Sequence, residues 1–191
     1  ALIHPRIAAG LETSSKNPFA SVYAGPGGGD PYGGTVPDLY YDLYGESNYT
    51  GKGIFDVEAY AAILDNRFPE NAILSHDMIE GGYLRAGFAG DIEFLDGFPG
   101  SVRSYFERDH RWIRGDWQLL PWLFPRVRTG GGHERNPLDR LTKWRILDNM
   151  RRSLTPAAVL AALFAVAWDG GGLTLAVAAL LCLAVPVLLC G

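Results

Sequence analysis

Cysteine is almost absent from this chain of 191 residues, which contains only Cys182 and Cys190. Both lie in an apolar run near the C-terminus, where a cysteine usually behaves as a small apolar side chain. The sequence therefore predicts neither a disulfide framework nor a thiolate metal site. The histidines also lack the spacing of metal ligands, so we expect no metal bound to this chain. No internal repeat and no secretory signal peptide are visible.

Charge is scarce in one part of the chain and unevenly distributed in the rest, although the net charge is only −4. Residues 1–102 contain 5 Lys and Arg against 14 Asp and Glu, whereas residues 103–152 contain 12 against 6. Residues 153–191 have a single charged residue, Asp169. The chain thus has an acidic half, a basic segment and an almost uncharged tail, and we expect no nucleic-acid partner.

The uncharged tail is predicted to form a transmembrane helical hairpin. Residues 154–168 are a first apolar run, and residues 173–190 are a second run with the length of a membrane-spanning helix. The basic segment 135–152 directly precedes the first run, which places that side of the membrane in the cytoplasm by the positive-inside rule. A pair of buried core helices is the alternative interpretation.

The rest of the chain is predicted to alternate helices and strands, which is typical of an α/β fold. Strands are expected at 1–9 and 91–97, helices at 36–46, after Asp56, from near Ser75, at 102–125 and at 138–152, and glycine-rich loops elsewhere in 10–50 and at 129–137. We expect three parts: a partial catalytic domain over 1–134, a basic interfacial helix over 135–152, and two transmembrane helices over 153–191. Because neither end resembles a natural boundary, we expect the chain to be a fragment.

The first candidate site is Ser75-His76-Asp77, with Glu80 one helical turn later. An Asp at a helix start, beside a His, is suited to act as a general base. The alternative is a helix cap, in which Ser75 or Asp77 accepts from free amides and Glu80 completes a capping box. Asp77 and Glu80 as the carboxylate pair of a glycoside hydrolase are a weaker possibility, because they do not face each other across a substrate.

The second candidate site is the stretch RDHRWIRGDWQ at residues 108–118. In a helix, Arg108, Arg111 and Trp112 lie on one face. Guanidinium groups form forked hydrogen bonds to phosphate, and an indole can stack on a sugar ring, so this face could hold a nucleotide diphosphate and a saccharide. A solvated helix face or a membrane-interface anchor would account for the same residues.

The third candidate is Gly51-Lys52-Gly53, whose glycines would let the backbone approach an anion or a sugar closely. It is not a phosphate-binding P-loop, because the leading Gly and the trailing Ser or Thr are missing. A plain turn is the alternative.

The order of these motifs is more specific than any one of them. The stretches GKGIFDVEAY, FPENAILSHDMIEGGYLRAGF, RDHRWIRGDWQL and LTKWRILDNMRRSLTP resemble the cyclic β-1,2-glucan synthases. Ser75-His76-Asp77 and Arg108 to Trp112 also resemble the Thr-Glu-Asp and Gln-x-x-Arg-Trp motifs of processive synthases of the cellulose-synthase type. Both depart from those motifs, but Asp77, Arg111 and Trp112 are retained. The resemblance covers about residues 1–165 and implies the C-terminal half of a glycosyltransferase domain of the GT-A fold.

The resemblance implies roles for the motif residues. Asp77 would deprotonate the acceptor hydroxyl, with His76 tuning or orienting it. Arg108 and Arg111 would stabilise the leaving diphosphate, and Trp112 would stack on the acceptor glucose. The loop residues Gly51, Lys52 and Gly53 would lie near the acceptor or the phosphates.

The same resemblance implies the context in which these residues act. It implies an inner-membrane enzyme with its catalytic part on the cytoplasmic side. This enzyme would transfer glucose from UDP-glucose to a glucan acceptor, with inversion at the anomeric carbon. It would act together with other domains of a larger protein. A divalent metal, Mg²⁺ or Mn²⁺, is also implied, but no Asp-x-Asp motif occurs in this sequence to bind it. We therefore expect this chain to be inactive alone. A membrane-anchored scaffold whose Arg and Trp residues bind lipid head groups is the alternative.

Overall fold

The computed structural model describes residues 1–24, 39–74, 77–169, 172 and 177. It divides the chain into two compact units, Ala1–Leu147 and Asp148–Gly191. The described part of the first unit mixes helices and strands, which confirms the predicted α/β class at that level. All three candidate motifs fall in this unit, although Ser75 and His76 lie outside the described residues.

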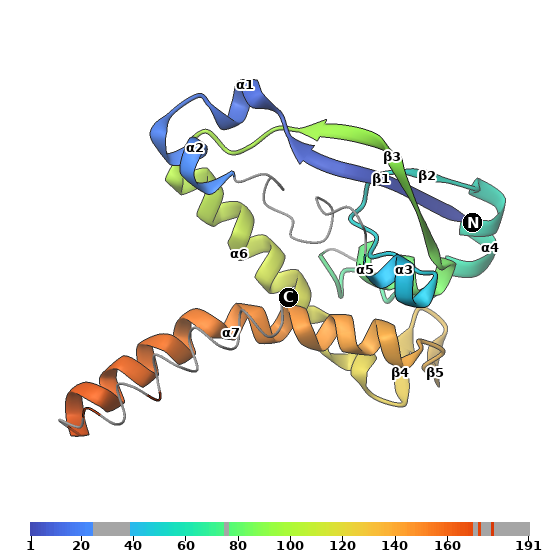
Figure 1. Cartoon of the computed structure of the whole chain (residues 1–191). Coiled ribbons are helices and arrows are strands. Elements are labelled where there is room, and N and C mark those ends of the chain that lie inside the picture. Colours follow the sequence, from blue (N-terminus) through green and yellow to red (C-terminus); the bar gives the residue numbers. More distant parts are fainter. Residues whose placement is uncertain (25–38, 75–76, 170–171, 173–176, 178–191) are drawn as a thin grey trace. The chain divides into compact units, whose positions relative to one another are not determined.

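A three-stranded sheet in the order β2-β1-β3 forms the frame of the first unit (Figure 1). Its strands are β1 (Leu2–Ala9), β2 (Ile54–Phe55) and β3 (Ala86–Asp96). β1 pairs antiparallel with β2 and parallel with β3, and the β1–β3 register shifts between Pro5 and Arg6. Pro5 accounts for this irregularity, since a proline has no N–H to donate to the ladder.

Short helices surround this sheet, and a longer one carries the arginine-rich stretch. They are α1 (Leu11–Ser14), α2 (Pro18–Tyr23), α3 (Leu39–Tyr44), α4 (Val57–Leu64), α5 (Asp77–Leu84), α6 (Val102–Gln118) and a 3₁₀ turn η1 (Leu120–Leu123). Asp56 caps α4 as predicted, because its carboxylate accepts from the amide of Ala59 at 3.0 Å.

One hydrophobic core of the described residues lies where the sheet meets α4 and α5. Leu2 of β1, Leu64 of α4, and Leu84 and Ala86 around the start of β3 are buried together with Tyr49. Tyr49 belongs to a segment without helix or strand, so the core fixes an irregular stretch of chain immediately before Gly-Lys-Gly.

The helix predicted from near Ser75 corresponds to α5, which ends at Leu84 because Arg85 adopts a left-handed φ of 59° and β3 begins at the next residue. One predicted helix boundary is wrong. The helix predicted over 102–125 ends at Gln118, after which the chain tightens into the 3₁₀ turn that contains Pro121.

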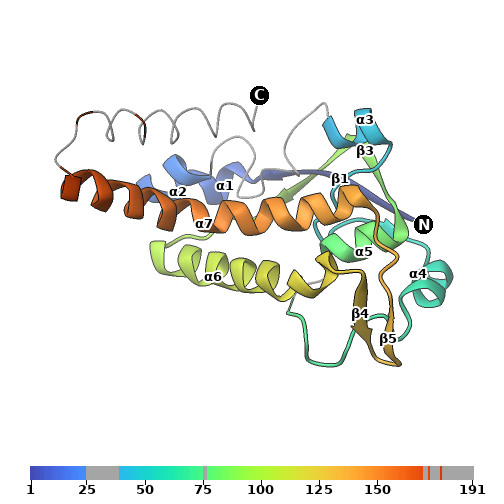
Figure 2. The same cartoon turned by 90° about the horizontal axis from the view of Figure 1, so that it is seen from below.

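The glycine-rich loop predicted at 129–137 is largely a β-hairpin, so that prediction is also wrong. β4 (Arg126–Thr129) pairs antiparallel with β5 (Gly132–Arg135). Val127 and Thr129 alternate with exposed residues, and this strand pattern is too short to stand out beside three glycines. In Figure 2 the hairpin is seen next to α4, and Glu134 of β5 pairs at 2.6 Å with Arg67, which follows that helix.

Helix α7 (Arg140–Asp169) continues without interruption from the basic segment into the first apolar run. Its residues up to Leu147 belong to the first unit and the rest to the second. In the part of the chain that the structure describes, no helix combines the length and the apolar character needed to cross a membrane. The predicted transmembrane hairpin is therefore not confirmed, and most of its second run lies outside the described residues.

Candidate active site

Asp77 is the first residue of α5 and lies directly against Gly51 of the Gly-Lys-Gly loop. A Cβ atom added at Gly51 would be 2.6 Å from Oδ2 of Asp77, and Gly51 has a φ of 80°. The positive φ favours glycine, since L-residues are strained there, and an added methyl group would have to displace the Asp77 carboxylate. The fold thus brings together the first and third motifs, which are separate in the sequence.

Lys52 extends from the same loop to the end of β3. Its Nζ donates to Oδ2 of Asp96 at 2.7 Å, and both side chains are largely exposed. This hydrogen bond, opposed by partial burial, holds the pKa of Asp96 below its ordinary value. The positive charge of Arg108 lowers the same pKa further, which indicates that α6 faces this end of the loop.

Arg108 and Trp112 lie on one face of α6, as the helical spacing predicts. The Arg108 guanidinium is 4.6 Å from the ring centroid of Trp112, 5.3 Å from that of Phe98 and 5.7 Å from that of Tyr105. Burial lowers the pKa of Arg108 from its ordinary value, partly offset by Tyr105 and Asp96. Within the described residues, its Nε and Nη2 are buried and have no hydrogen-bond partner.

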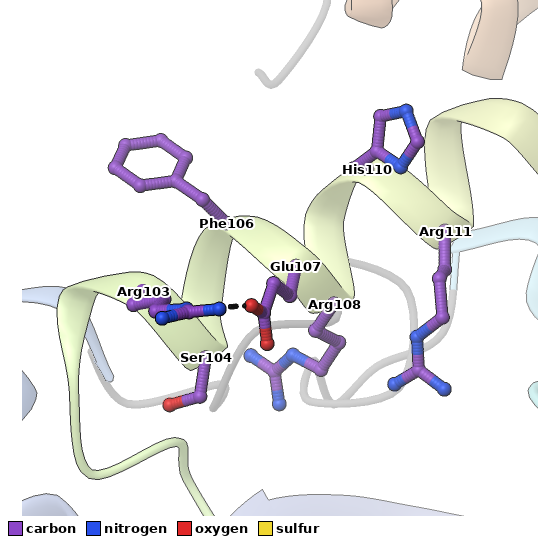
Figure 3. Close-up of a pocket in the computed structure, with 7 residues that line it drawn as sticks. All are labelled: Arg103, Ser104, Phe106, Glu107, Arg108, His110 and Arg111. Carbon is purple, nitrogen blue, oxygen red and sulfur yellow. Dashed lines mark hydrogen bonds and ion pairs between the residues drawn. The ribbon is translucent and has the colours of Figure 1, made fainter.

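Arg111 extends to the same side of α6 as Arg108, away from His110 and Phe106 (Figure 3). A hollow of about 680 Å³ runs along this helix, and its lining side chains come from residues between Arg103 and Arg111. Arg103 is held at this hollow by Glu107, 2.8 Å away. The hollow therefore offers space beside two cationic side chains, as an anion-binding surface requires.

Gln118 joins the end of α6 to the chain just before Asp77. Its Oε1 accepts from the amide of Leu74 at 2.7 Å. Gln118 therefore joins α6 to a neighbouring segment, but its partner Leu74 could not be predicted, because a glutamine at a helix end gives no sign of a distant partner. This bond places the second motif next to the first.

Two tyrosines complete the surroundings of α5. Tyr60 of α4 donates to Oε1 of Glu80 at 2.6 Å, and Glu80 is buried. Burial, followed by this hydrogen bond, raises the pKa of Tyr60 well above its ordinary value, so the phenol remains a donor. Burial also raises the pKa of Tyr49, and the charges of Glu80 and Asp77 raise it further, so Tyr49 lies near both carboxylates.

The described residues do not suit the divalent metal that the resemblance implies. Among them, no three or more His, Cys, Asp or Glu side chains are gathered so that they could hold an ion. Asp77 and Glu80 are only two carboxylates, and Glu80 is already bonded to Tyr60. We therefore assign no metal ligand to these residues.

The three motifs thus meet on one side of the first unit. Asp77 and Gly51 are in direct contact, Lys52 connects through Asp96 to Arg108, and Gln118 ties α6 to Leu74. A carboxylate, several cationic side chains and a partly exposed indole can supply a base, an anion-binding surface and a sugar platform.

Comparison with known proteins agrees with the motif analysis. No protein-family model matches the chain. The cyclic beta-(1,2)-glucan synthase NdvB of Rhizobium meliloti (strain 1021) is 44% identical over 162 residues, which is 84% of this chain. The chain spans only 5% of the length of that synthase. It is therefore homologous to a short segment of a cyclic β-(1,2)-glucan synthase, and the resemblance predicted from its motifs is confirmed.

Proposed function

We propose that this chain forms the acceptor side of a glucosyltransferase site, which transfers glucose from UDP-glucose to a growing β-1,2-glucan that is later cyclised. The contact between Asp77 and Gly51 carries this proposal, because it places a carboxylate next to the loop that also contains Lys52. The similarity to a segment of cyclic β-(1,2)-glucan synthase supports the choice of glucan as product.

In the proposed reaction Asp77 accepts the proton of the acceptor hydroxyl. The hydroxyl oxygen attacks the anomeric carbon of the donor glucose from the face opposite the diphosphate. The carbon–oxygen bond to UDP breaks, so the configuration inverts and UDP leaves with the electron pair. His76, which lies outside the described residues, would orient the base. General base catalysis of this kind typically contributes about 10²- to 10⁴-fold.

Arg108 and Arg111 would offset the charge that develops on the leaving diphosphate. Their common direction on α6 and the adjacent hollow support this role (Figure 3). Trp112 is 44% exposed, although one face of its indole is covered by Arg108. Its remaining surface would stack on the acceptor sugar.

The proposal includes a larger protein around this site. The donor nucleotide and the divalent metal would be held by residues outside this chain in a GT-A domain, so we expect this chain alone to be inactive. We also propose that the enzyme works at the cytoplasmic side of the inner membrane. The basic residues of 135–152 and the exposed side chains of Leu154, Phe164 and Trp168 on α7 support contact with lipid.

The hydrolase alternative has less support. A hydrolase that used Asp77 and Glu80 as its pair would need both carboxylates to face the substrate. Glu80 is 5% exposed and accepts a hydrogen bond from Tyr60. Glu80 is therefore better placed to stabilise α5 than to contact a sugar.

Synthesis assays on the full-length protein test the proposal. Asp77→Asn should abolish UDP-glucose-dependent glucan synthesis, whereas Asp91→Asn, which changes an exposed Asp of β3, should leave it intact. Trp112→Ala should reduce elongation and leave membrane association unchanged. If Trp112→Ala instead released the protein from membranes with synthesis intact, the lipid-binding scaffold would be the better account.

A further inference from the structure

The segment Glu46–Tyr49 is buried although it is neither helix nor strand. Its residues Glu46, Ser47, Asn48 and Tyr49 are at most 8% exposed. Its backbone polar groups must therefore find partners outside a regular ladder. The Ser47 amide donates to the carbonyl of Ala86 at 2.9 Å, and the two carbonyls of Glu46 and Ser47 are bound by another element.

That element is α7, through Arg145. The side chain of Arg145 is buried, and its Nη2 donates to the Glu46 carbonyl at 2.7 Å while its Nη1 donates to the Ser47 carbonyl at 3.2 Å. The guanidinium also lies 4.6 Å from the ring centroid of Tyr40. A planar fork that binds two successive carbonyls fixes both the position and the direction of the segment.

His4 of β1 holds the same segment from the sheet. Its Nδ1 is 3.1 Å from the Pro5 carbonyl, which can only accept, so Nδ1 carries a proton. Its Nε2 is 2.6 Å from Oγ of Ser47, and a neutral imidazole accepts there from the hydroxyl. Ser47 is therefore bound by α7 through its backbone and by β1 through its side chain.

The segment leads directly to the candidate base. Tyr49 packs on α5 at Gly81, where an added Cβ would be 2.8 Å from the Cβ of Tyr49. Two residues later, Gly51 lies against the Asp77 carboxylate. A shift of residues 46–49 would therefore move Gly51 relative to the Asp77 carboxylate.

We propose that Arg145 is a positioning residue for this site: its fork on the carbonyls of Glu46 and Ser47 sets the distance between the Gly-Lys-Gly loop and Asp77. The inference rests on the proposed function, in which Asp77 acts on the acceptor. It assigns Arg145 a role other than that of a basic residue on an interfacial helix. It also makes the start of α7 part of the site.

Hydrogen exchange and kinetics on the full-length protein test this role. Arg145→Lys keeps the charge but replaces the fork by a single ammonium group. We expect amide exchange in residues 46–51 to accelerate on the order of tenfold, with exchange in α6 unchanged. We expect glucan synthesis to fall by roughly tenfold to a hundredfold at an unchanged KM for UDP-glucose, because the base and the acceptor are misaligned.

Arg140→Lys is the matched control, since Arg140 is an exposed arginine at the start of the same helix. It should change neither measurement. Ser47→Ala, which removes the hydroxyl that contacts His4, is a second variant should Arg145→Lys fail to fold. It should show the same local acceleration and a smaller loss of synthesis.

Two outcomes would overturn the proposal. Faster exchange throughout the first unit would mean that Arg145 only stabilises the fold. Local acceleration with normal synthesis would mean that the loop position does not matter for the reaction. The exchange result does not depend on the identity of the base. A failure of the proposed function would instead appear as glucan synthesis that survives Asp77→Asn.

Discussion

Gly51 shows most clearly how a single residue shapes the candidate site. Its φ of 80° disfavours any side chain, and a methyl group there would have to displace the Asp77 carboxylate. The sequence alone leaves a plain turn and an anion-binding loop as alternatives for Gly51 to Gly53. The backbone contact with Asp77 supports a site, because it brings two motif residues to the same place.

We predict that Gly51→Ala disrupts the site more than the fold. Strain at positive φ costs about 1–2 kcal/mol, and the displaced loop should lower glucan synthesis by roughly tenfold or more. Gly131→Ala is the control, because Gly131 has open space around its Cβ position. Equal synthesis by both variants in the full-length protein would show that the loop does not need this close approach.

Gln118 gives a second prediction at this scale. Gln118→Leu removes the acceptor for the Leu74 amide and should cost about 1 kcal/mol locally, with a reduced rate of synthesis. Gln118→Glu keeps an acceptor oxygen and should retain most of the activity. The comparison of the two rates is the measurement, and a Leu variant as active as the wild type would remove Gln118 from the site.

Among the elements, α6 has the clearest sequence signal. Ser101 caps it, since its hydroxyl accepts from the amide of Ser104 at 3.2 Å, and the apolar and cationic residues then repeat at helical spacing. The β4–β5 hairpin was missed because four-residue strands beside three glycines carry little periodic signal. The extent of β3 was also missed, because its first residues continue the apolar pattern of α5.

We predict that the cap of α6 controls the order of its first turn. Ser101→Ala should destabilise that turn by about 1 kcal/mol, whereas Ser101→Asp should preserve it. Hydrogen exchange of residues 102–106 is the measurement. If exchange were accelerated equally in the Asp and Ala variants, side-chain capping would not be what stabilises this turn.

For the molecule as a whole, the sequence predicted which motifs belong together but not how they are held. The order of Gly-Lys-Gly, Asp77 and the arginine-rich helix indicated a glucan synthase, and 44% identity to a segment of one confirms that resemblance. The supports that hold Asp77 and the loop were not predictable. Tyr60, Gln118 and Arg145 act through contacts between residues 20, 44 and 98 or more positions apart, which no local pattern reveals.

The central claim is that Asp77 is the base of a glucosyl transfer, and single-turnover kinetics of the full-length protein with Asp77→Asn test it most directly. UDP-glucose binding should equal that of the wild type, while the rate constant of transfer to a glucan acceptor should fall by about 10²- to 10⁴-fold. Asp91→Asn should leave both quantities unchanged. A transfer rate within a few-fold of the wild type, at equal donor occupancy, would contradict the assignment of Asp77 as the base.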